Sequence, residues 1–298
     1  MKTLVCFLLF ITCFLLGIEG CNKNPADLSL EKELTEFVKD KDARIGIAVI
    51  SEDGDTISIK GNESFPMLSV YKFPQALAVA DFCIKNHISF SDTINIDKSQ
   101  IHSDTYSPLR ENYGIADLRL PISELLGYSL QQSDNNACDI LVNLIDGIEV
   151  SNTYISELGF PEIRILSTED EMHKDVSLCY ENSSTPLEMC RLLSYFNKEL
   201  KDSNPEYKYI SNLMETCQTG LDRLPKGLKN GDLIGHKTGT GDINSDGKII
   251  AINDVGYVQL SNGQKYCIAV FISDSNYDME ASSHLIGEIS NMVANFYR

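Results

Sequence analysis

Basic residues are scarce in this sequence of 298 residues, which contains 25 lysines and arginines against 43 aspartates and glutamates. The formal net charge is −18, and no run rich in lysine or arginine occurs. Because a nucleic acid partner requires basic surface to neutralise its phosphates, the charge balance argues against nucleic acid binding.

Histidines are also few, and the cysteines form no regular framework. The five histidines are scattered, without an H-E-x-x-H motif or a zinc-type Cys/His spacing, so we expect no metal and no cofactor. The nine cysteines include no C-x-x-C pair. Cys83, Cys138 and Cys190 fall in apolar helical patterns, where cysteine behaves as a small hydrophobic residue. We therefore predict mostly free, buried thiols, although export would permit disulfides.

The first twenty residues form an apolar targeting segment. Lys2 precedes an apolar stretch from Leu4 to Ile18, which is too short for a membrane-spanning helix and typical of a secretory signal. We predict a signal peptide over residues 1–20 and a periplasmic or secreted mature protein. The residues before Cys21 resemble a bacterial lipoprotein signal, except for Glu19, so a lipid anchor at Cys21 and plain secretion both remain open.

Strand patterns occur at the two ends of the mature chain, and helical patterns lie between them. Apolar alternation around Asp-Gly and Asn-Gly turns predicts two hairpins, over residues 44–60 and 254–273. We predict an α/β (α+β) two-lobed fold, in which the hairpins share an antiparallel sheet flanked by helices. The α/β lobe comprises residues 22–64 and 221–298, and residues 65–220 form an inserted all-helical lobe, together one domain. A site is expected in the cleft between the lobes.

Three Ser-x-x-Lys patterns occur, which makes the motif weak by itself. They are Ser29–Lys32, Ser69–Lys72 and Ser245–Lys248. Ser69 differs from the other two serines because a strongly apolar helical pattern follows it. Positions i and i+3 share a helical face, and a lysine buried near other cations has a lowered pKa and can act as a base. This stretch alone predicts either a nucleophile with its base or an ordinary helix start.

Two further motifs follow in order, Ser133-Asp134-Asn135 and Lys237-Thr238-Gly239, and each occurs once. The ordered trio is the signature of class A β-lactamases and penicillin-binding proteins. The sequence resembles a class A serine β-lactamase over essentially the whole mature chain. Tyr106, in "TYSPL", and the stretch "NDVG" at 253–256 match further segments of that family.

A carboxylate distinguishes the members of this family that release their acyl group. The usual pattern is Glu-x-x-Leu-Asn, whereas this chain has Glu169-x-x-Met172-His173, which resembles an extended-spectrum and cephalosporinase branch. Glu169 is therefore the expected general base. Asp170 and Glu171 are expected to be solvated neighbours, and His173 to have a structural role.

The same loop lacks the arginine–aspartate ion pair that usually closes it. Ser167 and Asn182 occupy the matching positions, which leaves the conformation and rigidity of the loop, and hence the substrate range, open.

The resemblance implies a two-step acyl transfer on a small-molecule β-lactam, by an enzyme that acts as a monomer. Ser69 would be the nucleophile, Lys72 or Glu169 its proton acceptor, and Ser133 the relay to the leaving nitrogen. The backbone N–H groups of Ser69 and Thr240 would form the oxyanion hole. The implied substrate-binding residues are Tyr106, Asn135, Lys237, Thr238, Thr240 and Arg223.

Each assignment has a plainer alternative. Ser133 could be a helix cap, Asn135 a turn residue and Lys237 a solvated strand charge. Glu169 could be one more surface acid, and Arg223 could belong to a surface ion pair. All of these alternatives would have to hold together, in the order of the family motifs.

Two rival functions share the trio of motifs. One is a penicillin-binding DD-peptidase, which lacks an efficient deacylating glutamate. The other is a non-hydrolytic β-lactam sensor, which is normally attached to a transmembrane region. A G-x-S-x-G elbow is missing, and "GDINSDGKI" fails as a phosphate-binding loop at Ile249. We therefore expect hydrolysis of β-lactam antibiotics, cephalosporins preferred over penicillins, which confers resistance.

Overall fold

The computed structural model describes residues 25–298, with side chains from Ser29 onward. The predicted signal peptide (1–20) and Cys21 lie outside the described residues. Within residues 25–298, none of the helices combines the length and the apolar character that crossing a membrane requires.

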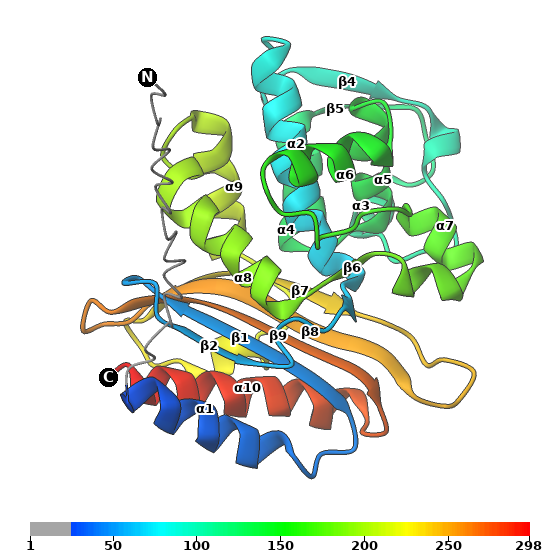
Figure 1. Cartoon of the computed structure of the whole chain (residues 1–298). Helices are drawn as coiled ribbons and strands as arrows, with labels where there is room; N and C mark the ends of the chain where they lie inside the picture. Colours follow the sequence, from blue (N-terminus) through cyan, green and yellow to red (C-terminus); the bar gives the residue numbers. More distant parts are fainter. Residues whose placement is uncertain (1–24) are drawn as a thin grey trace, which may run out of the picture.

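A five-stranded antiparallel sheet forms the centre of the molecule (Figure 1). In spatial order its strands are β2 (Thr56–Ile59), β1 (Arg44–Ser51), β9 (Lys265–Ser275), β8 (Ile249–Gln259) and β7 (Leu233–Thr240). β1 pairs with β9 from Arg44 opposite Ser273 to Ser51 opposite Tyr266. The two predicted hairpins therefore share one sheet, which confirms the expected fold class.

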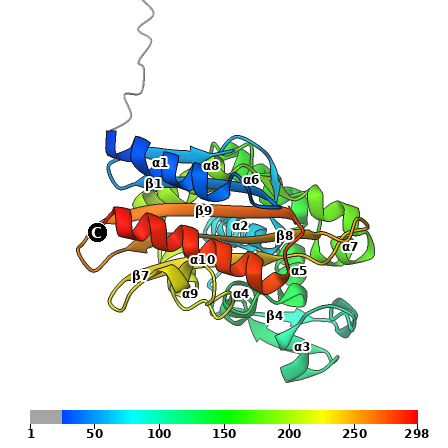
Figure 2. The ribbon, with the colours of Figure 1, turned by 90° about the horizontal axis from the view of Figure 1, so that it is seen from below.

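Two terminal helices cover one face of this sheet (Figure 2). They are α1 (Pro25–Val38) and α10 (Met279–Phe296). Leu34 of α1 and Ile289 of α10 have no exposed surface and pack in one apolar cluster with Val270 of β9. Burying a side chain of this size stabilises the fold by about 1.5–3 kcal/mol, so the apolar faces of both helices fix them to the sheet.

The opposite face carries α8 (Pro186–Tyr195), which packs against β1, β8 and β9 (Figure 1). The remaining helices are α2 (Lys72–Lys85), α3 (Pro108–Tyr113), α4 (Ile122–Gln131), α5 (Asn135–Leu144), α6 (Ile148–Glu157), α7 (Glu169–Lys174) and α9 (Pro205–Glu215). Of these, α9 also packs against the sheet, at β7. Two short strand pairs complete the fold, β3 (Phe65–Pro66) with β6 (Ser183–Ser184) and β4 (Thr93–Ile96) with β5 (Leu118–Pro121). All four strands lie within residues 65–220, so the prediction that this segment is all-helical is wrong.

Helix α2 is almost entirely buried, because apolar and small residues surround its axis on all sides. A short 3₁₀ turn, η1 (Leu68–Tyr71), leads directly into it. Pro74 is the third residue of α2, where the N–H group that proline lacks would have had no intrahelical partner. The helix can therefore begin immediately after the predicted nucleophile.

Candidate active site

The predicted nucleophile lies where η1 meets the end of strand β7. Gly239 of β7 permits this contact, because a Cβ atom at that position would lie 2.3 Å from the carbonyl oxygen of Met67. Leu68, directly before Ser69, has a φ of +47°, a conformation that costs energy in a bulky residue. The conformation of the turn that presents Ser69 is therefore stabilised by the surrounding structure and not by the backbone preferences of its own residues.

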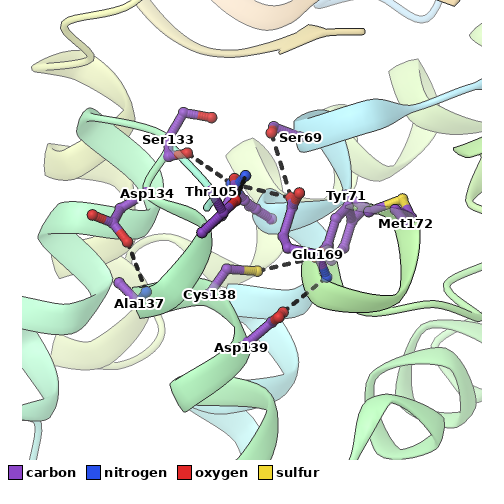
Figure 3. A network of polar contacts seen from close by, with 12 residues as sticks. Ser69, Tyr71, Thr105, Ser133, Asp134, Ala137, Cys138, Asp139, Glu169 and Met172 are labelled. Atoms are coloured by element: carbon purple, nitrogen blue, oxygen red, sulfur yellow. Dashed lines mark hydrogen bonds and ion pairs between the residues drawn. The ribbon is translucent and has the colours of Figure 1, made fainter. Parts of the chain in front are cut away.

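Lys72 joins the separate motifs. Its side chain has no exposed surface, and its Nζ lies 3.1 Å from Glu169 Oε1. The same nitrogen donates hydrogen bonds of 2.7 Å to the Ser133 carbonyl and to Asn135 Oδ1. Ser69 Oγ lies 3.5 Å from Glu169 Oε1 and points toward it (Figure 3). A buried ammonium requires a charged partner and satisfied hydrogen bonds, and Lys72 has both.

Ser133 and Asn135 are not the cap and turn residue of the plainer alternatives, which are wrong. The cap of α5 is Asp134, whose side chain accepts a hydrogen bond from the Ala137 N–H group at 2.8 Å (Figure 3). Ser133 has a φ of +60°. Asn135 is the first residue of α5, and its Nδ2 donates to Thr105 Oγ1 at 2.8 Å. Its amide oxygen is thereby left to face Lys72.

Lys237 is fully buried, so its interpretation as a solvated strand charge is wrong. Its Nζ donates to Ser133 Oγ and to the Thr238 carbonyl, both at 2.9 Å. Burial, followed by the charge of Lys72, lowers the pKa of Lys237 to about 8. On the same strand, Thr238 Oγ1 lies 2.6 Å from Thr219 Oγ1.

Arg223 is 7% exposed, and the surface ion pair considered for it is therefore wrong. Its guanidinium donates to the carbonyls of Gly239 and Asn253 at 3.0 and 2.9 Å, and to Thr240 Oγ1 at 2.7 Å. Burial lowers the pKa of this group. Arg223 thus ties the end of β7 to the middle of β8, beside Thr240.

These side chains surround a cleft of about 500 Å³. Tyr106 is 56% exposed at its rim. The predicted site residues that line the cleft are Ser69, Tyr106, Ser133, Asn135, Glu169, Arg223, Thr238 and Thr240.

Sequence reasoning missed the residue that positions Glu169. Asp139 of α5 accepts hydrogen bonds from the backbone N–H groups of Glu169 and Asp170, both at 2.9 Å (Figure 3 shows the first). Burial, followed by the charge of Glu169, raises the pKa of Asp139 to about 7. The available signal was a carboxylate within the buried segment 136–142 of α5.

Asn182 replaces the missing ion pair in the loop that carries Glu169. It has no exposed surface, and its Oδ1 accepts from the N–H groups of Leu166 and Ser167 at 2.7 and 2.9 Å. Its Nδ2 donates to the Ser167 carbonyl at 2.7 Å. The loop is therefore closed by a neutral amide in place of an ion pair.

The neighbouring acids of Glu169 have other partners. Glu169 is 9% exposed, so it is not a surface acid. Asp170 pairs with Lys174 at 2.5 Å, and Glu171 accepts from the Thr168 N–H group at 2.8 Å in a capping box. His173 pairs with Asp104 at 3.2 Å. The geometry thus selects Glu169 from the three consecutive acids.

Comparisons with known proteins agree with this geometry. The model of the β-lactamase enzyme family matches residues 29–297. The chain belongs to the class A serine β-lactamases. A β-lactamase of Bacteroides uniformis is 40% identical over 271 residues, covering 89% of this chain and 90% of that protein. β-Lactamase VEB-1 of Pseudomonas aeruginosa is 36% identical over 300 residues, covering 100% and 99%.

Solved structures of this family have the same fold. The extended-spectrum β-lactamase TLA-1 superposes with a TM-score of 0.88 at 38% identity, covering 91% of this chain and 99% of that one. A class A β-lactamase from Bacteroides cellulosilyticus gives 0.87 at 36% identity, covering 92% and 99%. This class A β-lactamase is thus a hydrolase that destroys β-lactams and confers resistance to them. The comparisons favour this function over the peptidase and the sensor.

Proposed function

We propose that this β-lactamase hydrolyses cephalosporins, and also penicillins, through an acyl-enzyme on Ser69. The observation that carries the proposal is the arrangement of three groups. Glu169 Oε1 lies 3.5 Å from Ser69 Oγ and 3.1 Å from Lys72 Nζ. A nucleophile, a carboxylate base and a buried cation therefore meet at one oxygen atom.

In the first step, Ser69 Oγ attacks the lactam carbonyl carbon, and its proton passes to Glu169. Lysine has three N–H donors and no acceptor when it is protonated. Lys72 Nζ faces three acceptors, on Ser133, Asn135 and Glu169. This pattern supports an ammonium in the resting enzyme, which can take the Ser69 proton only after giving one of its own to Glu169. Between the two bases left open by the sequence, we therefore assign the first proton transfer to Glu169.

The carbonyl oxygen becomes negative in this step, and the N–H groups of Ser69 and Thr240 would hold it. One such donor contributes about 3 kcal/mol. Because Ser133 Oγ already accepts from Lys237, its own proton is directed elsewhere and can pass to the leaving lactam nitrogen. Lys237, Thr238 and Thr240 would bind the substrate carboxylate.

The proton that Glu169 took from Ser69 replaces the one that Ser133 gave to the lactam nitrogen, so Glu169 is again a carboxylate. In the second step, Glu169 takes a proton from the water that attacks the acyl carbonyl and passes it to Ser69 Oγ as the ester bond breaks. The hydrogen bonds that Asp139 and Asn182 accept from the N–H groups of Glu169 and Ser167 support this assignment, because they fix the loop that carries the base. The preference for cephalosporins rests on similarity to proteins described as extended-spectrum, namely TLA-1 and, at 29% identity, PER-1 of P. aeruginosa.

The mechanism is tested by the intact mass of the protein over time after mixing with a cephalosporin. We expect the wild type to consume the drug and return to its free mass. Glu169→Gln should keep a covalent adduct, and Ser69→Ala should form none. Glu171→Gln is a matched control that should behave like the wild type, because glutamine also suits its capping position. A wild type that keeps its adduct, or a Glu169→Gln variant that turns over normally, would contradict the mechanism.

We further propose that the enzyme is exported and acts as a monomer, with the signal over residues 1–20 removed. Support comes from the sequence pattern before Cys21. The mass of the mature protein distinguishes a lipidated Cys21 from plain cleavage, and the Cys21→Ala variant should lose any lipid mass. A mature protein that retains residues 1–20 would contradict export by this signal.

A further inference from the structure

Cys217 lies beside the cleft, outside the catalytic groups. It follows α9 in an irregular segment that leads to Thr219 and Gly220, both of which line the cleft. Its Sγ lies 3.4 Å from Thr219 Oγ1, which in turn lies 2.6 Å from Thr238 Oγ1. A chain of three side chains therefore joins this thiol to the substrate-binding end of β7.

A histidine and an aspartate stand behind the thiol. After burial, His236 of β7, which is 2% exposed, is the group that acts most strongly on the Cys217 thiol. His236 Nδ1 lies 2.9 Å from Asp254 Oδ1 and 3.1 Å from Oδ2, and Asp254 has no exposed surface. The buried Cys–His–Asp series is the arrangement that favours a thiolate beside an imidazolium.

The charges around Cys217 also favour its thiolate form. Burial opposes ionisation of the thiol, but the hydrogen bond and charge of His236, followed by Lys237, lower the pKa of Cys217 to about 7. Burial likewise opposes protonation of His236, yet Asp254 and then Cys217 raise the pKa of the imidazole to about 10.

The other cysteines provide a matched comparison. All six cysteines of residues 25–298 are free and buried, as predicted. Cys179 and Cys217 are both 8% exposed. Burial, followed by the charge of Glu169, raises the pKa of Cys179 to about 11. Because Cys179 and Cys217 are equally exposed but have opposite surroundings, a difference in their reactivity can be assigned to the Cys–His–Asp series and not to solvent access.

We propose that Cys217 is a modification site for small disulfides and thiosulfonates, and that a group attached there disables the substrate-binding end of the cleft. The thiolate attacks a sulfur atom of the reagent and forms a new S–S bond. The old bond breaks, and its electron pair leaves with a thiolate or, from a thiosulfonate, with a sulfinate. Cys217 is 8% exposed and lies between two exposed residues, Thr216 and Gln218, which mark the side from which a small reagent would approach.

An attached group would act on the cleft through Thr219. The space around Sγ is already occupied by Thr219 and by the Gln131 carbonyl, 3.9 Å away. An added methylthio group must displace Thr219 and break its contact with Thr238. This second part of the inference rests on the proposed function, in which Thr238 binds the substrate carboxylate.

The test uses methyl methanethiosulfonate on the folded enzyme near neutral pH. The rate of mass gain is followed by intact mass and located by peptide mapping, in the wild type, Cys217→Ser, Cys217→Ala and Cys179→Ser. We expect one methylthio group on Cys217 in the wild type and in Cys179→Ser, at least about tenfold faster than on Cys179. The two Cys217 variants, checked for cooperative thermal unfolding, should gain none over the same period.

Cephalosporin turnover by the same samples tests the second part. Treated wild type should lose most of its turnover and regain it with dithiothreitol, whereas each Cys217 variant should keep the rate that it had before treatment. Slow labelling of Cys217, or equal labelling of Cys179, would overturn the modification site. Complete labelling with unchanged turnover would overturn the link to the cleft. Because labelling is read by mass, it decides the first part even if the untreated enzyme hydrolyses no β-lactam.

Discussion

Asp139 accepts a hydrogen bond of 2.9 Å from the backbone N–H group of Glu169, so one buried carboxylate positions the other. Its second oxygen accepts from the next N–H group at the same distance. Both donors belong to the first turn of α7, where backbone N–H groups lack partners within the helix. Helix α5, which begins with Asn135, thereby also fixes the helix that carries the base.

The elevated pKa of Asp139 predicts a pH-dependent stability. The folded protein keeps a proton on Asp139 up to about pH 7, whereas the unfolded chain releases it near pH 4. Its contribution is therefore fully present below about pH 4 and is lost as the pH rises through about 7, by up to about 1.4 kcal/mol per pH unit. Thermal unfolding of Asp139→Asn across this range should lack that loss. The exposed control Asp202→Asn should follow the wild type, and parallel curves for all three proteins would contradict the prediction.

Removal of the Asn182 amide should loosen the loop of the catalytic glutamate. In Asn182→Ala, the N–H groups of Leu166 and Ser167 lose their acceptor, which should cost about 1–3 kcal/mol of stability. Turnover should also fall, with the acyl-enzyme persisting longer in a mass time course. Asn295→Ala, at an exposed position of α10, is the control and should change neither property. Normal deacylation by Asn182→Ala would show that the amide is dispensable.

The close approach of Gly239 to Met67 can be tested with a single methyl group. Gly239→Ala should push η1 away from β7, because the new Cβ would lie 2.3 Å from a backbone oxygen. A misplacement of the catalytic serine by about 1 Å can lower kcat/KM about hundredfold. Gly127→Ala in α4 is the control, since its Cβ would meet only Gln131 Oε1, at 3.5 Å. The control should be as stable as the wild type or more so. Similar kinetics for both variants would count against the proposed contact.

Arg223 should act on substrate binding through Thr240. In Arg223→Ala the Thr240 hydroxyl and two strand carbonyls lose their donor, so we expect KM to rise about tenfold and kcat to change less. Arg223→Lys should recover part of the loss, because one cationic donor remains. Steady-state kinetics of both variants measure how the loss is divided between KM and kcat. A change confined to kcat would place Arg223 in the chemical step instead.

The two hairpins of the sheet and the three motifs could be read from the sequence because their signals are local, whereas strand β7 was not predicted. Residues 44–60 and 254–273 alternate around short turns, and the three motifs mark short segments whose order matched a family. Their convergence was not visible in the sequence itself, since Lys72, Ser133 and Glu169 come from separate elements.

The residues that hold the site were not predictable for a physical reason. Asp139 acts on backbone N–H groups, which every residue except proline carries, so the sequence gives no sign of its partner. Cys217, His236 and Asp254 meet only because β7 and β8 lie side by side and the segment after α9 passes over them. An isolated histidine or cysteine in the sequence gives no indication of such a meeting.

The pairing of β1 with β9 also bears on how the chain is made. β9 lies between β1 and β8 in the sheet but is the last strand to leave the ribosome. Until Lys265–Ser275 has been synthesised, β1 and its hairpin partner β2 have no connection to β8 or to β7, the strand that carries the Lys-Thr-Gly motif. The helices of the middle segment depend on contacts nearer in sequence and can form earlier. A nascent chain is thus kept from completing its active site until almost its whole length is available.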